Sequence, residues 1–192
     1  MSVARAVPAW FSDEERTVLE AACARLIPSG DTPGATEAGV ADYIEGLLGA
    51  FLVDPPRIWA GGPFSGRFGG PDGFAEFQPL SRIDELAWRT RIEGSLGIPE
   101  REFNGPVRGL QQIYSDGLAE LGRDFAQVSP DEQDSRLRAA KSFRRVLYDH
   151  CCEGMYGAPE YGGNRDLVGW RSIDYPGDVQ PRGWTDEEVS EP

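Results

Sequence analysis

The 192-residue sequence has very few of the side chains that build metal sites and disulfide frameworks: a single histidine, His150, and three cysteines, Cys23, Cys151 and Cys152. One histidine excludes a catalytic site that needs two. Three cysteines are too few and too badly spaced for a disulfide framework. Because their number is odd, at least one thiol is free or paired with another chain.

Long apolar runs and basic residues are also scarce. No stretch approaches the roughly 20 apolar residues of a membrane helix, so we expect no direct membrane insertion. Only 19 basic residues face 32 acidic ones, which gives a formal net charge of -13. Such a surface repels phosphate backbones and anionic lipid headgroups, which argues against nucleic-acid and membrane-surface partners. The 40% hydrophobic content is that of a globular protein.

The opening stretch MSVARAVPAWFSDEE has neither a twin arginine nor the apolar segment of about 7 to 15 residues that export signals contain. By itself, the sequence therefore predicts a cytoplasmic protein. Two alternatives stay open: a periplasmic protein that a partner carries out, or a sequence recorded without its leader.

None of the glycine-rich stretches has the context of a nucleotide site. The stretch GGPFSGRFGG, residues 61–70, is not followed by lysine with serine or threonine, and no strand precedes it. A GxGxxG motif does not follow a strand anywhere in the sequence. We therefore expect no cofactor on this chain.

Helical periodicity dominates the sequence, and no segment alternates in the manner of a strand. Ser12 with Glu15, and Ser129 with Glu132, form capping boxes, and Ser81 with Asp84 also opens a helix. Expected helices cover residues 13–26, 40–51, 81–92, 110–121 and 129–151. The prediction is one all-α domain of about five helices over residues 1–184, with long aromatic, Gly/Pro-rich loops at 54–79 and 155–184 and an acidic tail at 185–192.

The run DHCCE, residues 149–153, gathers potential metal ligands and nucleophiles. Consecutive helix residues are turned about 100° apart, so they cannot converge on one ion. Nothing in the sequence fixes a base against a thiolate. An independent small enzyme, or a metal or redox protein using His150, Cys151 or Cys152, is the alternative function. Adjacent cysteines can face different ways, one into the core and one toward another chain.

The stretch PEYGGNRDLVGWRSIDYPG, residues 159–177, is rich in turns and in aromatic residues. Asn164 follows two glycines, which predicts a tight turn with positive φ. Aromatic and arginine side chains on a loop are typical of an interface anchor. The alternative interpretation is a loop that wraps the core with Trp170 as its plug, and both interpretations can hold together.

The run EGMYGAPEYGGNRDLVGWRSIDYPG, residues 153–177, resembles the signature of the gluconate 2-dehydrogenase subunit 3 family. Residues 11–48, FSDEERTVLEAACARLIPSGDTPGATEAGVADYIEGLL, are similar to that family's opening helix, its Ile-Pro break and the entry to its second helix. The resemblance thus covers both ends of the chain in the expected order and spacing.

The resemblance implies a non-catalytic small subunit that binds and stabilises a large GMC-type oxidoreductase, and that matures it or helps to export it. FAD belongs to this partner, which oxidises a sugar, sugar acid or glycoside, and a cytochrome c subunit often accepts the electrons. No catalytic, cofactor-binding or metal-binding residue is transferred to this chain. We expect the partner to contact Tyr156, Tyr161, Gly162, Gly163, Asn164, Trp170, Tyr175, Phe64, Phe68, Phe74 and Phe77.

Overall fold

The computed structural model describes residues 9–56, 58 and 80–176. This part of the chain is helical and contains no strand, which confirms the predicted all-α class. The α-helices are α1 (Asp13–Leu26), α2 (Ala35–Ala38), α3 (Val40–Leu48), α4 (Arg82–Glu93), α5 (Leu110–Leu121), α6 (Pro130–Ala139), α7 (Lys141–Tyr156) and α8 (Val168–Ser172). Short 3-10 turns are η1 (Ala50–Leu52), η3 (Pro99–Arg101), η4 (Pro159–Tyr161) and η5 (Arg165–Leu167).

Two helices begin at serines that the sequence predicts as helix starts, and both serines form capping boxes. At the start of α1, the Ser12 amide donates to the Glu15 carboxylate at 2.9 Å and the Glu15 amide donates to the Ser12 hydroxyl at 3.3 Å. Ser81 and Asp84 make the same reciprocal pair at the start of α4. Each box satisfies backbone donors that a helix end would otherwise leave without a partner.

The expected single helix at residues 129–151 is two helices, because the chain bends at Ala140. Leu137 and Phe143 are both buried on either side of the bend. Six residues correspond to about 600° of helical rotation, so a straight helix would point these side chains to different faces. The second capping box is only half formed: Ser129 accepts from the Glu132 amide, while the Glu132 carboxylate pairs with Arg136.

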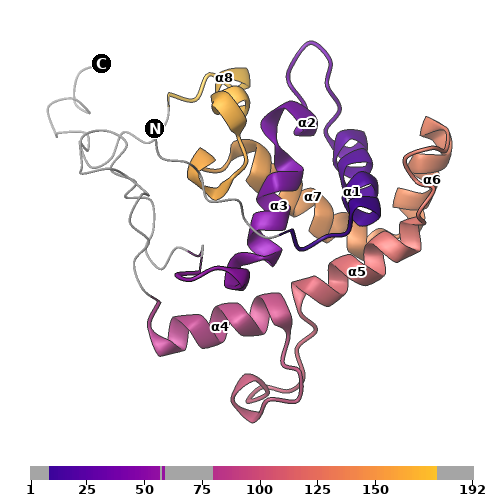
Figure 1. Ribbon diagram of the computed structural model, residues 1–192. Helices are drawn as coiled ribbons and strands as arrows, with labels where there is room; N and C mark the ends of the chain where they lie inside the picture. Colours follow the sequence, from indigo (N-terminus) through magenta and orange to yellow (C-terminus); the bar gives the residue numbers. More distant parts are fainter. Residues whose placement is uncertain (1–8, 57, 59–79, 177–192) are drawn as a thin grey trace, which may run out of the picture.

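Helix α7 occupies the centre of the fold and packs against α1, α2, α3, α5, α6 and α8 (Figure 1). The middle of the core is aromatic. The buried Tyr114 ring lies edge-on to Phe143, with ring centroids 5.4 Å apart, and stacks on the His150 ring at 5.7 Å. Helix α4 packs mainly on α5 and η3 and lies at the edge of the bundle. None of the helices in the described ranges is long and apolar enough to cross a membrane.

Candidate functional site

The chain does not leave the domain after α7. Residues 157–176, which we name the C-terminal cap, turn back over the end of α7 through η4, η5 and α8 and contact α2 and α3 (Figure 1). The sequence predicts a loop here, whereas the structure contains two 3-10 turns and a short helix. The segment with the most distinctive sequence is therefore an ordered part of the domain.

Asn164 is the residue that fastens the cap to α7. It is fully buried and has φ of 44°, which confirms the predicted left-handed turn. Its backbone N–H donates to the Gly154 carbonyl at 2.7 Å. Its side chain donates from Nδ2 to the Gly157 carbonyl at 3.0 Å and accepts from the Gly169 amide at 2.9 Å. One side chain thus provides a hydrogen-bond partner for a carbonyl at the end of α7 and for an amide at the start of α8.

Two glycines let the cap approach α7 closely. A Cβ on Gly163 would lie 2.2 Å from the Gly154 carbonyl oxygen, and a Cβ on Gly169 would lie 1.9 Å from the Met155 carbonyl oxygen. Real Cβ atoms do not approach an oxygen this closely. Gly163 of the YGGN stretch and Gly169 before Trp170 are therefore required by backbone packing.

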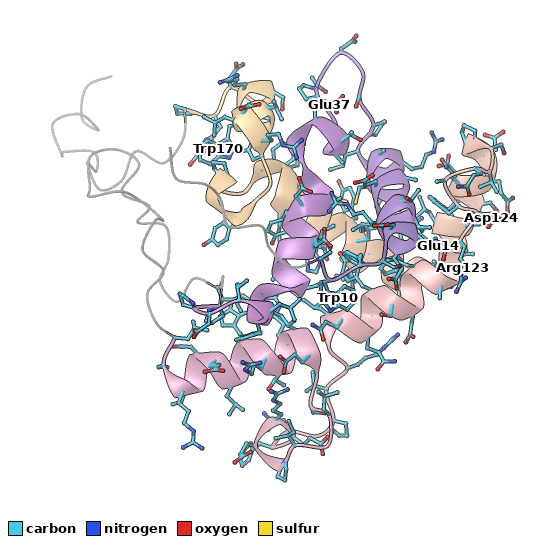
Figure 2. The ribbon with its side chains drawn as sticks, viewed as in Figure 1. Trp10, Glu14, Glu37, Arg123, Asp124 and Trp170 are labelled. Atoms are coloured by element: carbon cyan, nitrogen blue, oxygen red, sulfur yellow. The ribbon has the colours of Figure 1, made fainter. Side chains whose placement is uncertain are left out.

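Trp170 is a buried side chain of the cap, only 5% exposed. Its indole N–H donates to the Tyr156 carbonyl at 2.7 Å, and its ring lies edge-on to Tyr175 with centroids 5.1 Å apart. Figure 2 labels Trp170 at the cap, beside α8. These contacts support the interpretation of Trp170 as a plug. In this conformation a partner has no access to the side chains of Asn164 and Trp170, and Gly163 is buried as well.

Three tyrosines of the expected interface do reach the surface. Tyr156, Tyr161 and Tyr175 expose between 38% and 42% of their area. Gly162 is exposed beside Tyr161. We name these three tyrosines the tyrosine surface. Sequence reasoning missed the exposed Ile173 of the same cap. The remaining expected contacts, Phe64, Phe68, Phe74 and Phe77, lie outside the described residues.

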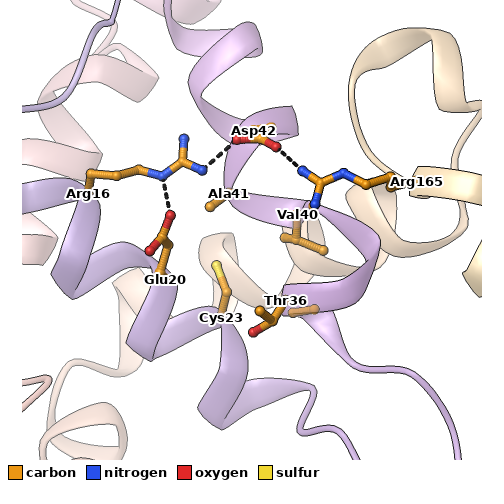
Figure 3. A pocket seen from close by; sticks show the side chains of 10 residues that line it. Arg16, Glu20, Cys23, Thr36, Val40, Ala41, Asp42 and Arg165 are labelled. Carbon is orange, nitrogen blue, oxygen red and sulfur yellow. Dashed lines mark hydrogen bonds and ion pairs between the residues drawn. The ribbon is translucent and has the colours of Figure 1, made fainter. Parts of the chain in front are cut away.

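A charged clamp joins the cap to the N-terminal half of the domain. Asp42 on α3 accepts from Arg16 on α1 at 2.5 Å and from Arg165 of the cap (Figure 3). Arg16 also binds Glu45 at 2.5 Å and Glu20 at 2.7 Å. The sequence did not predict the clamp, because 123 residues separate Asp42 from Arg165.

The clamp borders a cavity of about 190 Å³ between α1, α2, α3 and the cap. Burial alone would lower the pKa of Arg16, but hydrogen bonds to Asp42 and Glu20 outweigh it, so the pKa is raised. Both arginines at the cavity already hold a carboxylate (Figure 3). The arginines that border the cavity therefore hold the helices and the cap together, and they are not available to bind an anion.

The candidate chemistry at DHCCE does not converge on one point. His150 is buried, and its Nδ1 lies 2.8 Å from the Tyr114 hydroxyl. Burial lowers the pKa of the His150 imidazole. Cys151 is buried near Cys23, and the interaction between the two thiols, together with burial, raises the pKa of Cys23. Cys152 is only partly buried, so the adjacent cysteines face different ways. Within the described ranges, no three acidic, histidine or cysteine side chains form a metal-binding group.

Comparison with known protein families identifies a relationship that covers most of the chain. The profile of the family described as Gluconate 2-dehydrogenase subunit 3 matches residues 13–177, which is most of the chain. The match includes α1 to α8 and the C-terminal cap. Neither a curated protein nor a solved structure shows significant similarity to the chain.

Proposed function

The chain belongs to the gluconate 2-dehydrogenase subunit 3 family, and from this we propose that it is the non-catalytic small subunit of a dehydrogenase complex. Its partner is a large GMC-type flavoprotein that carries FAD and oxidises a hydroxyl group of a sugar, sugar acid or glycoside. A cytochrome c subunit accepts the electrons. This chain binds and stabilises the flavoprotein, and matures it or accompanies it on export.

The observation that carries the proposal is the construction of the C-terminal cap. The Asn164 side chain binds the Gly157 carbonyl and the Gly169 amide within the cap, and its backbone amide donates to the Gly154 carbonyl of α7. The tyrosine surface is thereby presented on a backbone that is already ordered before a partner arrives. Preorganised side chains lose less entropy on binding, and tyrosine is enriched among residues that dominate interface energy.

The contacts of the alternative candidates support a different role. The His150 ring is stacked on Tyr114 and hydrogen-bonded to its hydroxyl, and Cys151 contacts Cys23 in the core. These are the contacts of side chains that hold helices together. We therefore propose no separate enzymatic or metal-binding function for them.

Production of the chain together with a GMC-type flavoprotein of the same organism tests the proposal. We expect the two chains to elute as one species in size-exclusion chromatography, with the flavin absorbance in that peak. The flavoprotein produced alone should give less soluble, less FAD-loaded material. A folded monomer that elutes apart from the flavoprotein would refute the proposed function.

A further inference from the structure

A second surface of the chain is built to present an apolar tip. Residues 94–109 leave the end of α4 and return to the start of α5, and their ends meet: a Cβ on Gly109 would lie 2.3 Å from the Gly94 amide nitrogen. A surface loop whose ends are this close is an Ω-loop, a class that is frequently functional. Figure 1 shows that this Ω-loop projects beyond α4, away from the central helix α7.

The base of the Ω-loop is held by buried polar contacts. The Ser95 amide donates to the Val107 carbonyl at 2.9 Å, and the Val107 amide donates to the buried Ser95 hydroxyl at 3.0 Å. Arg101 donates to the Gly94 carbonyl at 3.1 Å and pairs with Glu93 at 2.9 Å. The side chain of Arg101 is only 9% exposed. The loop is thus fixed to the end of α4.

The tip is equally constrained, yet it carries the most exposed aromatic side chain of the described ranges. Glu102 accepts from the Gly97 amide at 3.1 Å through its carboxylate and from the Gly105 amide at 2.8 Å through its carbonyl. The first bond links Gly97, which follows Leu96, to Glu102, which precedes Phe103. Phe103 is 92% exposed and Leu96 is 70% exposed.

Such exposure contributes nothing to the stability of the isolated domain, because apolar area stabilises a fold only when it leaves water. Leu96 also has φ of 51°, a left-handed conformation that is unfavourable for leucine. The hydrogen bonds of the Ω-loop therefore hold two apolar side chains in water. A partner that covers them would gain their burial without having to order the loop first.

The charge of this region indicates the kind of partner. Residues 80–109 contain five arginines and five acidic residues, so their formal charge is zero, whereas the whole chain carries -13. An anionic lipid surface gains no attraction from a neutral tip on an acidic protein. A protein pocket that is apolar and uncharged meets no such repulsion from this region.

We propose that Phe103, flanked by Leu96, is a second anchor that inserts into an apolar pocket of the dehydrogenase subunit. This inference rests on the proposed function, since it assigns a further contact to the same complex. The Ω-loop and the C-terminal cap lie on different parts of the domain, so the subunit would be held at two separate places (Figure 1).

The test measures the affinity of the purified dehydrogenase subunit for the wild-type chain and for the Phe103→Ser variant. A central aromatic anchor gives a dissociation constant roughly 30-fold higher when removed. The matched control is Ile83→Ser, which removes an apolar side chain that is 77% exposed on α4, outside the Ω-loop. We expect less than about a threefold change for the control. The thermal melting curves of both variants should match that of the wild type, because neither side chain is buried.

The outcomes separate this inference from the proposed function. If the wild type does not bind the dehydrogenase subunit, both fail. If the wild type binds and Phe103→Ser binds equally well, or if both variants weaken binding to the same extent, only the anchor fails. The anchor is also refuted if the Phe103→Ser change leaves binding to the dehydrogenase subunit intact but abolishes flotation of the chain with vesicles of phosphatidylcholine and phosphatidylglycerol. The same holds if the change instead abolishes self-association in analytical ultracentrifugation.

Discussion

Asn164 accepts the backbone N–H of Gly169 at 2.9 Å, and this buried bond joins the turn after α7 to the helix that carries Trp170. The same side chain donates to the Gly157 carbonyl. The C-terminal cap therefore depends on one amide group that both donates and accepts. Only asparagine offers this combination on a short side chain that tolerates a left-handed backbone.

Replacement of Asn164 by alanine should detach the cap. The Gly157 carbonyl and the Gly169 amide would lose their partners, and unsatisfied buried polar groups are costly. We expect the free energy of unfolding to fall by about 2 to 4 kcal/mol, as measured by urea denaturation. The control is Asn104→Ala at an exposed position. Equal stability of the two variants would show that Asn164 is not the fastening residue.

Gly169→Ala tests the close approach of the cap to α7. The new Cβ would lie 1.9 Å from the Met155 carbonyl oxygen, so the backbone must move apart. We expect a loss of about 1 to 3 kcal/mol and faster proteolytic cleavage within the cap. Gly30→Ala is the matched control, because a Cβ there has no heavy atom within 4 Å. A cap that resists protease equally in both variants would contradict this account.

Arg16→Met tests the charged clamp. The change removes the cation that Asp42 and Glu45 share, which leaves Asp42 paired with Arg165 alone. We expect a loss of about 1 to 3 kcal/mol in low salt, because these groups are only partly exposed, and a smaller difference in high salt. Arg123→Met is the control, since Arg123 and its partner Glu14 lie in solvent (Figure 2). The Arg123–Glu14 ion pair should contribute nothing measurable to the free energy of unfolding. A clamp variant as stable as this control would be inconsistent with this role of the clamp.

The pH dependence of stability has a defined sign at His150. Burial lowers the imidazole pKa in the folded chain, so the unfolded chain takes up the proton first as the pH falls. Stability is therefore full above the ordinary pKa of about 6.5 and decreases as the pH drops below it. Because His150 is the only histidine, one imidazole NMR signal reports the folded pKa directly. A measured value at or above about 6.5 would contradict the buried, neutral ring.

Helix starts were predictable from sequence because their signals are local. Ser12 and Ser81 lie three residues before a carboxylate that completes the cap, and both helices begin there. The bend at Ala140 was not predictable, since neither glycine nor proline marks it. It arises because Leu137 and Phe143 both reach the core. The helix is therefore broken at Ala140 by the burial of side chains in the core, and not by the helix propensity of the local sequence.

The C-terminal cap was recognisable from sequence, but its internal roles were not. Asp166 and Leu167 adopt positive φ angles that their residue types do not favour. Contacts across the chain impose this backbone and allow α8 to form inside a predicted loop. Whether Trp170 packs inward or outward depends on a carbonyl at Tyr156 that no sequence pattern identifies. The exposed tip at Phe103 depends in the same way on the folding of the Ω-loop.

The most direct test of the central claim is the dissociation constant between the purified dehydrogenase subunit and this chain. We compare the wild type with a Tyr156→Ala, Tyr161→Ala double variant and with Tyr148→Ala, an exposed tyrosine of α7 that does not belong to the tyrosine surface. The account predicts tight binding by the wild type and the Tyr148 variant, and a loss on the order of 2 kcal/mol or more for the double variant. A wild-type chain that shows no binding, or a double variant that binds as tightly as the wild type, would contradict it.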